Sequence, residues 1–146
     1  MEPQISAEVK KNKVKLDFKE SKYATGRRKK SIAKVWLKKG SGNFYVNGKK
    51  MDEYFHKSNL QTALLRPLTI TKRENEYDVR SSVKGGGHTG QAGAIIHGLA
   101  RAIVLYEPDL KSTLKKENLT TRDSRTVERK KYGRRKARRS FQFSKR

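Results

Sequence analysis

Cysteine is absent from the 146 residues, and long apolar runs are absent as well. Without cysteine, disulfides and thiolate metal sites are excluded. No apolar run approaches the roughly 18 residues that cross a bilayer. The N-terminus lacks the apolar block of a signal peptide. We therefore expect a soluble protein in the cytoplasm, with no membrane partner.

Acidic residues are scarce, with 14 Asp and Glu against 37 Lys and Arg, so the formal net charge is +23. A charge of this size repels itself in a compact state, which favours a polyanionic partner. Nucleic acid is the expected partner, ahead of an anionic membrane surface, which the charge alone would also allow. Hydrophobic residues make up 33%, enough for a modest core in one domain.

Hydrophobic patterning predicts strands followed by helices. A hairpin is expected from residues 32–37 and 44–46 around the turn GSGN, and two more strands from 68–71 and 77–83. A helix from Ser58 or Asn59 should stop at Pro67, and apolar residues recur at helical spacing after Gln91. These elements predict an α/β two-layer fold, with a four-stranded sheet and helices on one face.

The two ends of the chain differ from its middle. Residues 1–21 are expected to be a flexible extension, with a short edge strand at Val14–Phe18 as the alternative. Residues 22–118 should form the globular domain, and residues 119–146 an extended basic tail. From Arg122 onward the tail holds twelve Lys or Arg and two acids, a formal charge of +10. Such a segment cannot pack a core and is usually disordered until a partner orders it.

The stretch KGGGHTGQAGA at 84–94 suggests a phosphate loop that opens a helix. A nucleotide-binding P-loop has Gly, four residues, Gly, Lys and then Ser or Thr. Gly85 and Gly90 match that spacing, but Gln91 replaces the lysine and Ala92 replaces the hydroxyl residue. Nucleotide catalysis is therefore disfavoured.

Two interpretations of this glycine loop remain open. Thr89 could cap the helix, and the helix N-terminus together with Lys84 would attract an anion. The alternative is a tight strand-to-helix turn that binds nothing, since glycine permits such turns. The high positive charge of the chain favours the anion site.

Metal and hydrolytic chemistry are poorly supported. Glu74, Glu76 and Asp78 would share one face of a strand, but Lys72, Arg73 and Arg80 flank them, which is typical of a solvated hairpin. The three histidines lack zinc-ligand spacing, so no metal or other cofactor is expected.

Several motifs together resemble the bacterial-type small-subunit ribosomal protein nine family. They are ATGRRK at 24–29, VKGGGHTGQAGAI at 83–95, the later TRD and VERKK, and the terminal KARRSFQFSKR. The resemblance covers residues 22–146. It implies a fold like the second domain of ribosomal protein five, with a left-handed βαβ crossover. It also implies a structural protein of the small-subunit head, not an enzyme.

The resemblance further implies partners and contact residues. The partners are small-subunit ribosomal RNA, peptidyl-site transfer RNA and neighbouring head proteins, in a bacterial or an organellar ribosome. The end of the tail, Ser144, Lys145 and Arg146, would contact transfer RNA. Ribosomal RNA would be bound by the basic cluster, the glycine loop and the tail, through Arg27, Arg28, Lys29, Lys30, Lys84, Gly85, Gly86, Gly87, His88, Thr89, Gln91, Arg129, Lys130, Lys131, Arg134, Arg135, Lys136, Arg138 and Arg139. A free nucleic-acid-compacting protein is the competing class.

Overall fold

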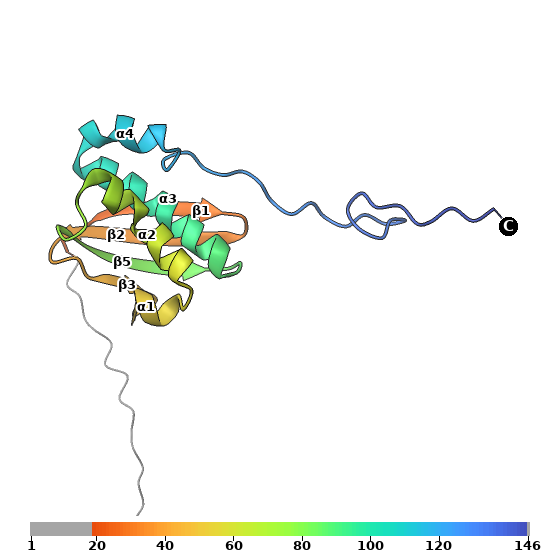
Figure 1. Ribbon diagram of the computed structural model, residues 1–146, viewed down its shortest axis with the longest axis horizontal. Helices are drawn as coiled ribbons and strands as arrows, with labels where there is room; N and C mark the ends of the chain where they lie inside the picture. The colour runs from red at the N-terminus through yellow and green to blue at the C-terminus, as the bar shows by residue number, and fades with distance from the viewer. Residues whose placement is uncertain (1–18, 146) are drawn as a thin grey trace, which may run out of the picture.

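Alternating apolar and polar residues form the two longest strands. In β2 (Ser31–Lys39) every second residue from Ser31 to Leu37 is buried, and in β5 (Tyr77–Lys84) every second residue from Tyr77 to Val83. Because successive side chains of a strand point to opposite faces, one face of the sheet is buried and the other is exposed. The computed structural model describes residues 19–145, and Figure 1 shows helices lying over the sheet.

The sheet has five strands in the order β1-β2-β5-β3-β4. Neighbours are antiparallel, except that β3 runs parallel to β5. The predicted mixed α/β class is confirmed, but the sheet has five strands where four were predicted. The remaining strands are β1 (Lys22–Arg28), β3 (Phe44–Val46) and β4 (Lys49–Lys50), and β3 connects to β5 through α1 (Met51–Tyr54) and α2 (Ser58–Thr71).

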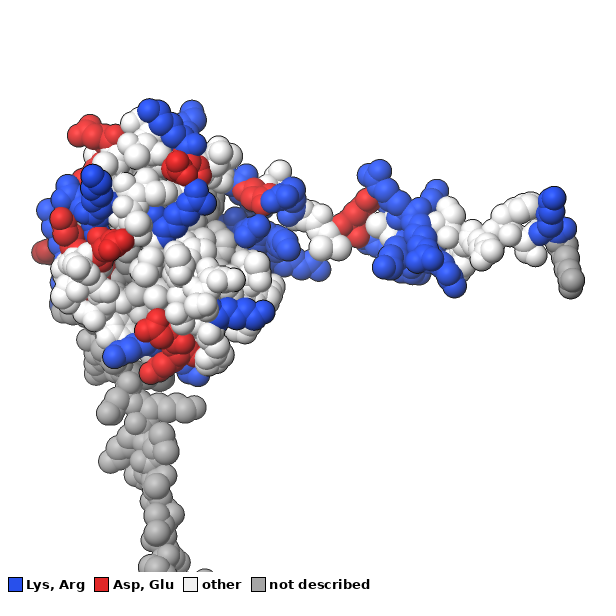
Figure 2. Space-filling model, viewed as in Figure 1, with Lys and Arg blue, Asp and Glu red and all other residues white. Residues whose placement is uncertain are grey.

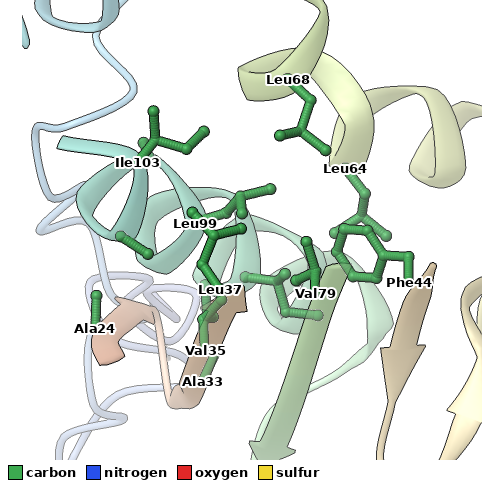
Figure 3. Close-up of a cluster of buried hydrophobic side chains, with 14 of the residues drawn as sticks. Ala24, Ala33, Val35, Leu37, Phe44, Leu64, Leu68, Val79, Leu99 and Ile103 are labelled. Carbon is green, nitrogen blue, oxygen red and sulfur yellow. The ribbon is translucent and has the colours of Figure 1, made fainter. Parts of the chain in front are cut away.

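The hydrophobic core lies between the sheet and two helices, α2 and α3 (His88–Tyr106). Figure 3 shows Leu99 of α3 beside Leu37 of β2, and Leu64 of α2 beside Phe44 and Val79. Leu37, Leu64 and Leu99 have no exposed surface. Burying a side chain of this size contributes about 1.5–3 kcal/mol, so the core fixes α3 firmly on the sheet.

The chain leaves the core through two short elements, η1 (Pro108–Leu110) and α4 (Lys111–Lys116). Leu114 and Leu119 are both buried in the main core. From Thr121 to Lys145 the tail has neither helix nor strand, and Figure 1 shows it running away from the globular body. Along residues 19–145, no helix combines the length and the apolar character that crossing a bilayer requires.

The prediction for residues 58–71 was wrong in its second half. Helix α2 continues through Pro67 to Thr71, and residues 68–71 are helical instead of a strand. The β-branched run Thr69-Ile70-Thr71 favours a strand locally, and proline removes one helical hydrogen bond. Packing outweighs both effects, because Pro67, Leu68 and Thr71 are buried as part of one helix.

The predicted hairpin was also wrong. β2 pairs with β1, and the turn between them is Lys29–Lys30. The GSGN segment instead leads to β3, which pairs with β5. The carboxylate of Asp78 accepts backbone N–H bonds from Ser41 at 3.0 Å and Asn43 at 2.8 Å, and these bonds hold the segment beside β5.

Strand β1 lies unusually close to α3 because two glycines face each other. A Cβ on Gly26 would lie 1.8 Å from the carbonyl oxygen of Ala94, and one on Gly98 would lie 2.8 Å from Cγ2 of Val35. A larger residue at either position would push the helix off the sheet. This contact brings the basic start of the β1–β2 turn against the helix.

Two predictions fall partly outside the described residues. The alternative edge strand at Val14–Phe18 lies in residues 1–18, and the proposed transfer RNA contact Arg146 is the last residue of the chain. Neither has a structural account.

Candidate nucleic-acid interface

The β1–β2 turn carries four consecutive basic residues. Arg28 pairs with Ser31, so Lys29 and Lys30 form the turn itself. Lys29 has a φ of +51°, in the left-handed region. Lys29 and Lys30 are exposed, as is Arg27, whereas Arg28 is half-buried. The strand pairing thus presents three exposed cationic side chains at one end of the sheet.

The glycine loop is fastened to this turn through Ser31. The buried Ser31 hydroxyl donates to the carbonyl oxygen of Gly85 at 2.9 Å. The side-chain amide of Gln91 donates to the same oxygen at 3.2 Å and accepts a hydrogen bond from the Tyr54 hydroxyl at 2.8 Å. Gln91 therefore holds the loop in place, at the position where a P-loop has its catalytic lysine.

The second and third glycines of the loop have different requirements. Gly86 has a φ of +65°, and a Cβ there would lie 2.2 Å from the Ser31 hydroxyl oxygen. Gly87 has a φ of −105°, and a Cβ there would meet no atom within 4 Å. Gly86 is thus required by the fold, whereas nothing within the described chain requires Gly87 to be glycine.

Helix α3 begins directly after the loop and points its N-terminus outward. Its N-cap is Gly87, without a side-chain hydrogen bond, so the predicted cap by Thr89 was wrong. Residues 84–89 are all exposed. The first N–H groups of a helix have no partner within it and carry partial positive charge. With Lys84 beside them, they form a surface suited to an anion.

His88 lies at the edge of this surface. Its ring packs edge-on against Tyr54, with centroids 5.7 Å apart, and against Phe55, with centroids 6.0 Å apart. Residue Phe55 is buried, whereas His88 is exposed. The aromatic contacts thus hold the imidazole beside the loop without covering it.

Arg28 crosses the helix to reach the start of the tail. A Cβ on Gly93 would lie 2.2 Å from Cδ of Arg28, so the arginine passes over a glycine. Its Nε lies 3.6 Å from a carboxylate oxygen of Asp123. Hydrogen bonds from Arg125, together with the charge of Arg28, hold the pKa of Asp123 well below its usual range. Arg28 therefore links the body to the tail.

His97 and Arg101 of α3 cover the outer edge of β1. The Arg27 backbone N–H donates to Nδ1 of His97 at 3.3 Å, and Arg101 donates to the Thr25 carbonyl oxygen at 2.6 Å. Burial lowers the pKa of His97, and the charge of Arg101 acts in the same direction. A hydrogen bond with the backbone of Thr120 opposes them. Sequence reasoning missed this role, since it tested His97 only for metal-ligand spacing.

The tail carries the remaining cations of the predicted interface. The eight predicted contact residues from Arg129 to Arg139 are all exposed, as are Ser144 and Lys145. Glu128 pairs with Lys131 and with Arg138, and Arg134 donates to the Arg138 carbonyl oxygen at 2.8 Å. Figure 2 shows these lysines and arginines gathered along the projecting chain. The tail is thus a run of cations interrupted by two acids, Asp123 and Glu128, which pair with tail cations.

Two of the three carboxylates considered for metal binding have other partners. Glu76 pairs with Arg73 at 2.7 Å, and Asp78 holds the backbone of residues 41–43. Among residues 19–145, no three His, Asp or Glu side chains are grouped to hold a metal ion.

The structure brings together the basic turn and the glycine loop, which the sequence placed more than fifty residues apart. The tail begins next to them, at Asp123, and carries further cations outward. A family model described as ribosomal protein S9/S16 matches residues 26–146, which include the turn, the loop and the tail. The chain therefore belongs to the ribosomal protein S9/S16 family, whose members are structural ribosomal proteins that bind ribosomal RNA and are not enzymes.

Proposed function

We propose that the protein is a structural constituent of the small-subunit head and binds small-subunit ribosomal RNA through three connected surfaces. These are the basic cluster at the β1–β2 turn (Arg27–Lys30), the glycine loop (84–91) and the tail. The observation that carries the proposal is the hydrogen bond from Ser31 to Gly85, because it joins the turn and the loop into one cationic surface. Each lysine or arginine placed on a phosphate releases counterions, which makes such binding strong and sensitive to salt.

The end of the tail contacts peptidyl-site transfer RNA in this proposal. Ser144 and Lys145 are exposed, and Figure 1 shows the tail running away from the globular body. An extended chain of this kind carries charge to a site that the body cannot reach. Lysine serves there as a mobile point charge, and the terminal arginine suits forked phosphate recognition. We also propose that the connection from β3 to β5 is the left-handed crossover that the family resemblance implies.

Sedimentation tests the location. A tagged chain should co-sediment with small ribosomal subunits and remain with them after nucleoid DNA is digested. A chain that follows the nucleoid instead would identify a nucleic-acid-compacting protein and overturn the proposal.

Truncation tests the transfer RNA contact separately. Deleting Ser144–Arg146 should leave subunit assembly mostly intact and weaken peptidyl-site transfer RNA binding to purified subunits. A matched control is Lys130→Ser with Lys131→Ser, which removes two cations from the middle of the tail and leaves the end unchanged. Equal transfer RNA affinity in wild-type and truncated subunits would remove this role.

A further inference from the structure

The exposed face of the sheet, opposite α2 and α3, carries a row of aromatic and cationic side chains. Tyr23 lies directly opposite Trp36, Trp36 opposite Arg80, and Arg80 opposite Tyr45. The row therefore crosses four adjacent strands at one level. We call Tyr23, Trp36, Arg80 and Tyr45 the aromatic row. None of its members belongs to the turn, the loop or the tail.

The aromatic row is held in place by its own contacts. The rings of Tyr23 and Trp36 have centroids 5.5 Å apart and are tilted by 45°. The guanidinium carbon of Arg80 lies 5.8 Å from the Trp36 ring centroid. The hydroxyl of Tyr23 shares a hydrogen bond with that of Thr25 at 2.8 Å. Despite these contacts Tyr23 remains 44% exposed, and Trp36 is only half-buried.

Positive charge surrounds the aromatic row. Two residues before Trp36 on β2, Lys34 faces the same side of the sheet and lies between Thr25 and Ser82. Two residues further, Ile32 lies between Arg27 and Lys84. Arg27 and Lys84 also belong to the candidate interface, so the two surfaces are continuous. Among the outward-facing residues of the five strands, all within the described chain, Asp78 is the one acid.

We propose that the aromatic row is a second RNA contact, which stacks unpaired bases of ribosomal RNA while the flanking cations hold their phosphates. The inference rests on the proposed ribosomal RNA binding and adds the surface and the single-stranded character of the RNA. Aromatic side chains stack on bases of every type, because every base has a π-face. In a duplex those faces are covered by neighbouring base pairs, so only splayed bases can stack on the aromatic row.

Charge favours RNA over a protein partner on this face. A protein surface docking here would have to cover Arg80, Lys34, Arg27 and Lys84 together, and burying unpaired cations is costly. Phosphates spaced along an RNA strand satisfy cations placed around a stacking surface. The competing explanation is that Tyr23 and Trp36 pair only to stabilise the sheet. That role predicts no response to RNA.

Tryptophan fluorescence tests the proposal, because Trp36 is the only tryptophan in the chain. Single-stranded oligoadenylate should quench Trp36 saturably at raised salt, where phosphate contacts are weakened. Inorganic polyphosphate, which has charge but no bases, should not. Tyr23→Leu should weaken the oligoadenylate affinity by about 5- to 100-fold, the range for losing one base stack. The control is Leu105→Ala on α3, which is 55% exposed and lies outside the turn, the loop, the tail and the aromatic row.

Two results of this titration would overturn the proposal. One is equal quenching by polyphosphate and oligoadenylate. The other is an oligoadenylate affinity that Tyr23→Leu leaves unchanged, which would leave Tyr23 with a role in stabilising the sheet alone. Either result leaves ribosomal RNA binding by the turn and the loop untouched.

Crosslinking in assembled small subunits separates RNA from protein as the occupant. A photoreactive benzoylphenylalanine in place of Lys34, next to the aromatic row, should crosslink to RNA and give a nuclease-sensitive product. A crosslink to protein alone would overturn the proposal while the proposed function stands. A wild-type chain that never enters small subunits would overturn both.

Discussion

At the scale of single residues, substitutions of two loop glycines allow effects on folding to be measured separately from effects on binding. Gly86→Ala should destabilise the fold by about 1–3 kcal/mol, because the residue needs a left-handed conformation and alanine would strain it there. Gly87→Ala should change stability by less than about 1 kcal/mol, since its conformation suits alanine and the space is open. Chemical denaturation of the two variants measures both effects.

Gly87→Ala therefore also tests whether RNA lies close to the glycine loop. If an RNA backbone lies against the loop, the added methyl group should reduce incorporation into subunits although the free protein is stable. Normal incorporation of this variant would support the plain strand-to-helix turn that the sequence left open.

His97 predicts a dependence of stability on pH. Burial lowers its pKa in the folded protein below the value near 6.5 expected when unfolded. The unfolded chain therefore binds the proton more readily, and the free energy of unfolding falls as the pH drops below about 6.5. His97→Gln should flatten this acid limb in urea titrations, with His56→Gln, on an exposed histidine, as the control. An unchanged acid limb would show that another group causes it.

At the scale of elements, the contact between turn and loop depends on one hydroxyl. Ser31→Ala should lower the free energy of unfolding by about 1 kcal/mol, the usual contribution of a hydrogen bond of this kind. It should also speed hydrogen exchange at the first turns of α3, because the loop leading into the helix loses an anchor. Ser82→Ala on the neighbouring strand is the matched control. Equal exchange in both variants would contradict the anchoring role.

The elements that could be predicted are those whose patterns match their packing. α3 shows its buried stripe at Ile95, Leu99 and Ile103, and β5 shows a regular alternation. β1 could not be predicted, because KYATGRR has almost no apolar side chains, and the strand is held by β2 and by the close approach of Gly26 to α3. Residues 68–71 were wrongly predicted to form a strand, because burial within a helix outweighs their local strand propensity.

The candidate interface was predictable in its parts but not in its assembly. The basic cluster and the glycine loop are visible as motifs, yet only strand pairing shows that Ser31 joins them. Gln91 could be recognised as a departure from a P-loop, but its bonds to Gly85 and Tyr54 depend on tertiary contacts. The aromatic row requires the strand order, which places β2 and β5 side by side.

At the scale of the whole molecule, the body should fold without the charged part of the tail. Deleting residues 122–146 removes +10 of the formal charge of +23 and the partly exposed pair between Arg28 and Asp123. Exposed pairs contribute about 0–1 kcal/mol, so circular dichroism and thermal unfolding should change little.

A longer truncation provides the control for this prediction. Deleting residues 119–146 also removes the buried Leu119 and should cost about 1.5–3 kcal/mol more. Collapse of the fold in the shorter deletion would show that the tail belongs to the core.

Deleting residues 122–146 should also change how RNA binding responds to salt. Each phosphate contact contributes roughly 0.7–0.9 to the slope of log K against log salt concentration. Removing the tail should therefore reduce that slope by several units, while Arg27→Ser should reduce it by about one. Filter binding at a series of salt concentrations measures both, and an unchanged slope would show that the tail does not contact phosphate.

The covering of β1 by α3 has a consequence for the protein before it meets RNA. An uncovered edge strand offers its backbone to any passing strand and so promotes aggregation. Here Arg101 and His97 already bond to outward-pointing groups of Thr25 and Arg27. A newly made chain would have to break both bonds before its sheet could extend into a neighbour's. The helix that supports the candidate interface thus also shields this edge of the sheet from pairing with a second copy of the chain.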